Sequence, residues 1–97
     1  MVAGRAPAQI PMEKSIYSED YLLCLEKLRE ARRTAGLTQD EVANRLGKHA
    51  TQSFVSKCER GERRIDIVEL RAFCRAIGVS FSQFSVQLDE LLTKSDS

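Results

Sequence analysis

The side chains best suited to chemistry lie between residues 51 and 60, where polar residues recur at helical spacing. At about 100° per residue, Val55 and Cys58 fall on one side of a helix and a set of polar side chains falls on the other. That set comprises Gln52, Ser53, Ser56 and Lys57. Glutamine can pair with N6 and N7 of adenine, and lysine can reach O6 and N7 of guanine, in the DNA major groove. The pattern therefore predicts a helix with one buried face and one face that can read bases.

Three arginines follow this segment and could hold DNA phosphates. Arg60, Arg63 and Arg64 lie directly after the polar face, and guanidinium groups are well suited to phosphate recognition. We expect them to contact the DNA backbone. The alternative is that they only confer solubility, because Glu59 and Glu62 are close enough in the sequence to form surface ion pairs with them.

The distribution of charge along the chain favours a nucleic-acid surface, although the net charge of the whole chain is only +1. Residues 27–75 contain twelve lysines and arginines against seven acidic residues, a net charge of +5. Residues 1–26 and residues 76–97 each carry a net charge of −2. A basic middle between acidic ends is typical of a DNA-facing surface on a soluble domain, and chance clustering on a solvated face is the alternative.

The sequence lacks the residue patterns of an enzyme or a metal site. Cys24, Cys58 and Cys74 are far apart, and none forms a CxxC pair or a Cys/His pair at zinc-site spacing. Each lies among apolar neighbours at helical spacing, which predicts buried thiols. No Ser/His/Asp or Cys/His set and no phosphate-binding glycine loop is present. We therefore expect no catalytic activity, no cofactor and no metal.

Length and composition indicate a single soluble domain. Ninety-seven residues, of which 42% are hydrophobic, can form one core without disulfides or metals. The sequence has no apolar stretch long enough to span a membrane and no basic-then-apolar leader. We therefore expect a cytoplasmic protein without membrane association. Residues 1–17 are predicted to form a flexible arm, residues 18–93 the domain, and residues 94–97 a frayed tail.

Helix starts and stops are marked regularly along the predicted domain. Four glycines follow helical patterns at the position where a left-handed residue ends a helix. They are Gly36, Gly47, Gly61 and Gly78. Three pairs have capping-box spacing, namely Thr38 with Glu41, Asp66 with Glu69, and Ser80 with Gln83, while Ser18 and Thr51 are candidate caps without a reciprocal partner. These signals predict an all-α fold with helices over residues 19–35, 38–46, 51–60, 66–77 and 81–93.

Helical periodicity also predicts the core. Apolar residues at spacings of three and four form one face on the first, second and fourth predicted helices. The residues expected to be buried are Leu22, Leu25, Leu28, Ala31 or Ala35, Val42, Ala43, Leu46, Ile67, Leu70, Phe73, Cys74 and Ile77.

The second and third predicted helices form the pair on which the functional prediction depends. Each has about two to three turns and is too short to be stable alone, and a short connection through Gly47 joins them as in a helix-turn-helix. Three segments, LEKLREARRTAGLTQDEVA (residues 25–43), SFVSKCERG (53–61) and IVELRAFCRAIGVS (67–80), resemble the phage-repressor and Cro type of helix-turn-helix protein, the XRE family. The resemblance covers about residues 21–92 and implies a compact, five-helix, λ-repressor-like DNA-binding domain.

Carried over to matching positions, the resemblance implies roles for several residues. Gln39 would open the second helix against a DNA phosphate, and Gln52, Ser53 and Lys57 would enter the major groove. The hydroxyl groups at the starts of these two helices, those of Thr38 and Thr51, are further candidate phosphate contacts.

The chain departs from the family pattern at two places. It is two residues longer than usual between Gly47 and Gly61, so residues 48–50 enlarge the turn, either as a bulged loop or as an extra helical turn. His49 lies in this turn and could touch phosphate when charged, although a lone histidine in a turn is more often only solvated. Phe54 occupies a position that is usually small or polar, and we expect it to pack beneath the turn rather than to contact a thymine methyl group.

The last predicted helix has an apolar stripe that predicts self-association. The stripe consists of Phe81, Phe84, Leu88, Leu91 and Leu92. Part of it must cover the first helix, and an apolar patch left over usually marks an interface. We expect an isologous homodimer through this helix, because paired DNA half-sites require a two-fold symmetric protein.

Together these features predict a sequence-specific regulator of transcription, and a repressor in particular, that binds operator half-sites in double-stranded DNA. No small-molecule ligand is expected, because no separate ligand domain is present. The alternative is a protein-interaction module of the same fold, of the antitoxin or anti-repressor type, that grips a protein partner. The basic residues around the third predicted helix favour DNA.

Overall fold

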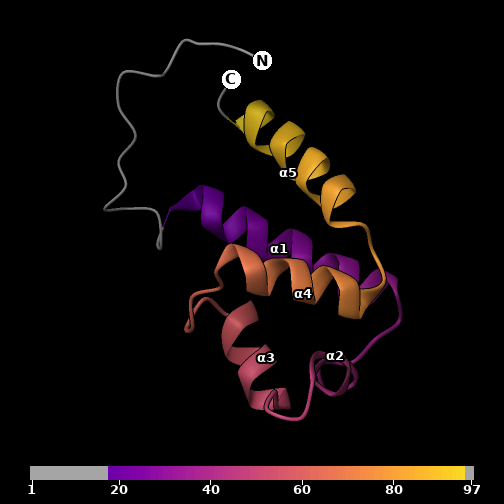
Figure 1. Cartoon of the computed structure of the whole chain (residues 1–97). Coiled ribbons are helices and arrows are strands. Elements are labelled where there is room, and N and C mark those ends of the chain that lie inside the picture. Colours follow the sequence, from indigo (N-terminus) through magenta and orange to yellow (C-terminus); the bar gives the residue numbers. More distant parts are fainter. Residues whose placement is uncertain (1–17, 96–97) are drawn as a thin grey trace.

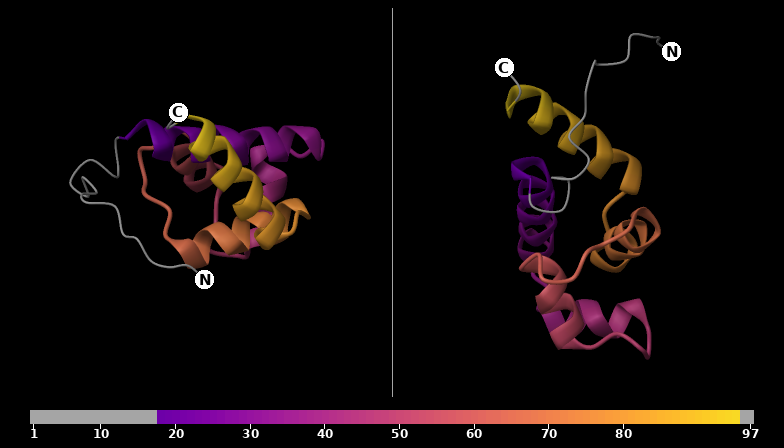
Figure 2. Two further views of the ribbon diagram at one scale, coloured as in Figure 1. Left: turned by 90° about the horizontal axis from the view of Figure 1, so that it is seen from above. Right: turned by 90° about the vertical axis from the view of Figure 1, so that its left-hand side faces the viewer.

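The computed structural model describes residues 18–95, and within this range the chain forms five α-helices and no strands. These are α1 (Glu19–Thr34), α2 (Gln39–Leu46), α3 (Gln52–Glu59), α4 (Ile67–Ile77) and α5 (Phe81–Ser95). Helices α1 and α4 cross the middle of the molecule, with α2 and α3 on one side of them and α5 on the other (Figures 1 and 2). The all-α prediction is confirmed, with helix ends correct to within two residues. The predicted arm, residues 1–17, lies outside the described residues.

Side-chain caps start the helices where the sequence predicts them. Two capping boxes are complete, Thr38 with Glu41 and Asp66 with Glu69. Ser18 and Thr51 cap α1 and α3, and Ser80 accepts a hydrogen bond from the Gln83 N–H at 3.2 Å, as the first half of the third predicted box requires. Each cap satisfies a backbone donor that the helix itself leaves unpaired.

The four predicted glycines all have positive φ angles. Gly78 ends α4 in the left-handed conformation, with φ +94° and ψ 22°. Gly47 differs from the prediction, because its φ of +133° and ψ of 174° are extended rather than left-handed helical. That region of backbone conformation is open almost only to glycine, so Gly47 can turn the chain sharply out of α2.

The enlarged turn between α2 and α3 is a bulged loop. The Ala50 N–H donates to the Gly47 carbonyl at 3.1 Å, which closes a tight turn over residues 47–50. Helix α3 then begins at Gln52, with Thr51 as its cap. The extra residues therefore lie outside the helix.

The core lies where the helices meet, and its buried members come from all five helices. They are Leu28, Val42, Ala43, Val55, Cys58, Phe73, Cys74, Ala76, Ile77 and Phe84. Leu25 is also buried, as predicted. Partly buried residues, including Ala31, Leu46 and Leu70, pack around this cluster.

Two core predictions are wrong, because Leu22 and Ile67 are 52% and 70% exposed. At 100° per residue, Leu22 lies about 90° around α1 from the centre of the buried stripe. Tyr21 lies on that stripe instead, and its hydroxyl accepts a hydrogen bond from the Ile65 N–H at 3.1 Å. Ile67 is the first residue of α4, one turn before Leu70, where contact with the core begins.

Helix α5 extends two residues further than predicted. Lys94 and Ser95 are helical rather than frayed, and the Thr93 hydroxyl donates to the Asp89 carbonyl at 2.8 Å in this last turn. A lysine near a helix C-terminus is favoured by the helix dipole. Residues 96–97 lie outside the described residues. Over residues 18–95, no helix is long and apolar enough to cross a membrane.

Candidate nucleic-acid interface

A hydrogen bond between two glutamines joins the starts of α2 and α3. The Gln52 side chain donates from Nε2 to Oε1 of Gln39 at 2.7 Å. We call this contact the glutamine bridge. Gln39 in turn donates from Nε2 to Oε1 of Glu59 at 2.9 Å. Because Glu59 engages the nitrogen of Gln39, the oxygen of that amide faces Gln52. The second amide N–H of Gln52 and its carbonyl oxygen stay available for a ligand.

A buried ion pair holds Glu59 in place beneath the glutamine bridge. Arg32 on α1 donates to both carboxylate oxygens of Glu59, at 2.7 and 2.9 Å, and to the Leu37 carbonyl at 2.9 Å. The two side chains are only 10% and 3% exposed. Burial by itself would raise the pKa of Glu59, but hydrogen bonds from Arg32 and Gln39, and the charges of Arg32 and Arg29, lower it below its usual value. Glu59 is thus a buried, charged link between α1, α2 and α3.

This arrangement corrects one expectation and adds two residues. In the alternative interpretation of the arginines that follow α3, Glu59 would pair with them at the surface, but it pairs with Arg32 inside the fold. The sequence contains a signal for this pair. Arg32 shares the buried stripe of Leu28, and Glu59 lies one turn after Val55 on the buried side of α3. A charge on each of two buried stripes requires an ion pair.

The polar face of α3 is largely open to solvent. Gln52, Ser53 and Lys57 are exposed, and the ammonium group of Lys57 has no hydrogen-bond or ion-pair partner within residues 18–95. Ser56 is half-buried, and its hydroxyl accepts a hydrogen bond from the Arg60 guanidinium. At the helix starts, the Thr38 and Thr51 side chains are exposed while they cap α2 and α3. The structure therefore gathers Thr38, Gln39, Thr51, Gln52 and Ser53 at one end of the α2–α3 pair.

The predicted phosphate-binding arginines lie on the surface with different partners. Arg60 donates to both oxygens of Glu62, at 2.8 and 3.1 Å. Arg63 donates to Glu69 on α4 at 2.6 Å, and its guanidinium lies 5.0 Å from the centre of the Phe54 ring. Arg64 is exposed. Arg63 is therefore directed toward α4 and away from Gln52.

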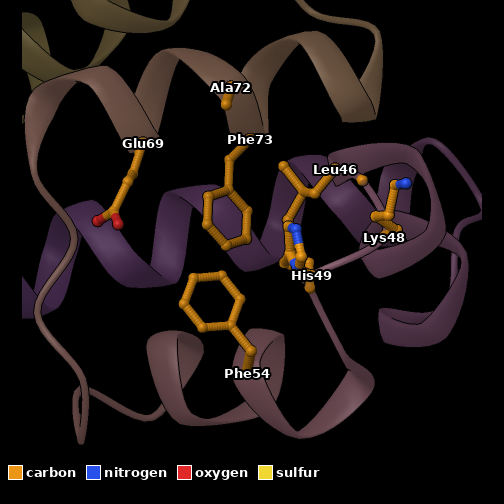
Figure 3. Close-up of a pocket in the computed structure, with 9 residues that line it drawn as sticks. Leu46, Lys48, His49, Phe54, Glu69, Ala72 and Phe73 are labelled. Carbon is orange, nitrogen blue, oxygen red and sulfur yellow. The ribbon is translucent and has the colours of Figure 1, made fainter.

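Phe54 packs inward, as expected, and helps to line an apolar recess beneath the enlarged turn. Its ring stacks on Phe73 of α4, with centroids 6.2 Å apart. Figure 3 shows the two rings facing each other, with Leu46 beside them and His49 and Lys48 at the edge. His49 is exposed and has no partner within the described part of the chain.

The cysteines are placed as small apolar residues. Cys58 and Cys74 are buried, and Cys24 is half-buried. Burial raises the pKa of all three thiols, to about 11 for Cys58 and Cys74. Across residues 18–95, no group of three or more His, Cys, Asp or Glu side chains could hold a metal ion.

Comparisons with known proteins agree with this arrangement. A family model described as a helix-turn-helix domain matches residues 26–83, more than half of the chain. An uncharacterized HTH-type transcriptional regulator from Sinorhizobium fredii is 39% identical over 59 residues, which cover 61% of this chain and 74% of that protein. The solved structure of an XRE-family like protein from Pseudomonas syringae pv. tomato has a TM-score of 0.73 and 41% identity, and the match covers 84% of this chain and 98% of that one.

Proposed function

Because this chain belongs to the XRE family of helix-turn-helix transcriptional regulators, we propose that it binds operator DNA sequence-specifically with α3 in the major groove. The observation that carries this proposal is the glutamine bridge. A side chain that reads bases must be held in one orientation before it meets DNA. Gln52 is held by Gln39, and through Gln39 by the buried pair of Glu59 and Arg32.

The orientation of Gln52 favours adenine as its partner. With one amide N–H donated to Gln39, its second N–H can donate to N7 of adenine and its carbonyl oxygen can accept from N6. Ser53 and Lys57 lie on the same exposed face of α3 and supply further base contacts. Ser56 would have to exchange its bond with Arg60 for a base.

Contacts with phosphates would supply most of the affinity. The N-terminus of α2 carries Thr38 and Gln39 beside Gln52, in a surface depression that Arg33 and the acidic Asp40 also line. Backbone N–H groups at a helix N-terminus favour a phosphate there. Arg60 and Arg64, with Thr51 and His49, lie at the edges of the α3 surface and would hold further phosphates. Arg63 would do so only after releasing Glu69.

We further propose that two copies bind paired half-sites as a homodimer through α5 and repress transcription by occupying the operator. Of the predicted interface, Leu91 is exposed and Leu92 half-buried, while Phe81 and Leu88 pack partly against the core. Phe84 is only 3% exposed and belongs to the chain's own core, so it is not part of the proposed interface. Val86, which is 56% exposed, replaces it.

Selection from a pool of random double-stranded DNA, followed by sequencing of the bound fraction, tests this function. We expect an enriched two-fold symmetric motif with half-sites about one helical turn, roughly 34 Å, apart. Asymmetric enrichment would contradict the dimer. A pool without any enriched motif would contradict sequence-specific binding and would support the protein-interaction module instead.

A further inference from the structure

We infer that a groove along α4 docks an acidic, amphipathic segment of a partner protein. The groove has two adjoining parts. The first is the apolar recess beneath the enlarged turn, of about 360 Å³, which Phe54 and Phe73 line. The second is a cleft of about 430 Å³ between the end of α2 and α4. Leu46 and Ala72 line both parts, so the two adjoin, and together they are called here the α4 groove.

The α4 groove combines an apolar floor with a basic rim. Val68, at 74% exposed, lines the cleft, and Ile67 beside it is 70% exposed. The rim of the cleft carries Arg45, Arg71 and Arg75. An apolar surface that stays this exposed on a folded domain is typical of an interaction site, and the arginines determine the charge of what it can accept.

Two of the rim arginines lack any acidic partner. Arg71 and Arg75 lie one turn apart on α4, and neither side chain forms a hydrogen bond or ion pair within residues 18–95. Arg45 uses one N–H to bind the Ala76 carbonyl at 3.0 Å and lies one turn from Glu41. The one acidic residue that lines the groove, Glu69, is paired with Arg63 at 2.6 Å. The groove is therefore positive, and its one carboxylate is already paired.

A protein segment with carboxylates beside apolar side chains matches this surface. Its apolar side chains would enter the recess between Phe54, Ala72 and Leu46, and its carboxylates would pair with Arg71 and Arg75, as amphipathic helices do in grooves of this kind. DNA phosphates would match the arginines but would leave the stacked phenylalanines of the recess unused (Figure 3).

The groove lies apart from the base-reading face. On α3, Phe54 is about 200° around the helix from Gln52, so the two side chains leave on opposite sides. The recess is nevertheless lined by Lys48 and His49, in the turn that leads directly into Gln52. A partner in the groove could thus bind while DNA is bound and would contact the segment that positions α3.

Selection of displayed random peptides against the purified full chain tests the inference without DNA. We expect the enriched peptides to combine Asp or Glu with Leu, Ile or Phe. Their affinity should fall on the order of tenfold or more for the R71E/R75E variant, since reversal places like charges together, and also for V68E. The R33E/K94E variant makes the same change of charge elsewhere and should bind them as the wild type does. All of these side chains are exposed, so the variants should stay folded. R33E/K94E places acidic groups near two helix C-termini and should lower the melting temperature only slightly.

Two outcomes would overturn the inference. The first is a set of peptides without acidic enrichment, or one that binds R71E/R75E as tightly as the wild type. The second concerns DNA. If the two arginines instead hold phosphates, R71Q/R75Q would lower the slope of log affinity against log salt by about 2, because each lost phosphate contact removes about 0.9. We expect that slope to stay at its wild-type value.

Discussion

At the residue scale, the proposed base-reading surface depends on the buried carboxylate of Glu59, which is 4% exposed. Glu59 accepts hydrogen bonds from Arg32 and from Gln39, and Gln39 accepts from Gln52. Each step fixes the orientation of the next polar group, because an amide can present its oxygen to only one side. The Gln52 side chain is therefore oriented from inside the fold, before DNA is present.

Replacing Gln52 by alanine tests its role in base reading. We expect Q52A to lose on the order of 1–3 kcal/mol of binding free energy on the selected site and little on random DNA, because it loses base contacts but no phosphate contacts. Fluorescence anisotropy titrations with both duplexes measure this difference. Equal losses on the two duplexes would show that Gln52 does not discriminate bases.

Replacing Glu59 by glutamine tests the buried ion pair. The E59Q variant leaves Arg32 buried with a weaker partner, so we expect the free energy of unfolding to fall by about 3–5 kcal/mol. Urea unfolding at neutral pH measures this loss. E62Q is the matched control, because the Arg60–Glu62 pair is about half exposed on both sides and exposed pairs contribute little.

The same ion pair predicts the pH dependence of stability. In the folded state the pKa of Glu59 lies below its ordinary value of 4.5. The stability that this carboxylate contributes is therefore complete above the unfolded pKa, and it is lost as the pH falls through the folded pKa. Between pH 5 and more acidic conditions, the wild type should lose more stability than E59Q. Parallel acid-denaturation curves for the two proteins would contradict a charged Glu59.

At the scale of the elements, the helices could be predicted because their signals are local. A cap, its N–H donor and its reciprocal glutamate lie within four residues, so Thr38, Asp66 and their boxes can be read directly from the sequence. The bulged turn could not be settled this way. Residues 48–50 lie over the contact of Phe54 with Phe73, which comes from a distant part of the chain, and such packing cannot be read from the local sequence.

The two complete capping boxes permit a matched comparison. T38A and D66A each remove the cap of a short helix, so each should lower the free energy of unfolding by about 1 kcal/mol. Only T38A alters the start of α2, where Gln39 begins the glutamine bridge, so only T38A should weaken DNA binding as well. Thermal unfolding and DNA titration of both variants measure the two effects. Equal DNA affinities for T38A and D66A would show that the start of α2 does not contribute to DNA binding.

At the scale of the whole molecule, packing between distant segments determines which apolar residues are buried and which charges pair, and this could not be predicted from the sequence. Leu22 and Ile67 satisfy a helical apolar pattern, yet no other helix covers them. Glu59 belongs to a surface-like run of charges, yet its partner lies 27 residues away in the sequence. The candidate reading face could be predicted from the angular positions of residues on one helix. The Arg32–Glu59–Gln39 network beneath it could not, because it forms only where three helices meet.

The proposed dimer also belongs to this scale, because it constrains how two whole copies meet. Helix α5 lies on the opposite side of α1 and α4 from α3, the proposed reading helix (Figure 2). Both copies can therefore face one DNA duplex only if the two-fold axis runs roughly from the α5 end toward the α3 end. The exposed side of α5, with Val86 and Leu91, would then lie next to that axis.

A charged residue on this side of α5 should prevent dimerisation without unfolding the chain. Leu91 is 38% exposed, so we expect L91E to fold with nearly the wild-type melting temperature but to sediment as a monomer at concentrations where the wild type is a dimer. It should also bind a single half-site about as well as the wild type while losing the added affinity of the paired site, because linked half-sites gain from effective concentration.

F84A is the contrasting variant. Its side chain is 3% exposed, so it should lose about 3–5 kcal/mol of stability through the cavity it leaves. A wild-type chain that sediments as a monomer at high micromolar concentration, or an L91E variant that still dimerises, would show that the two copies do not meet through α5.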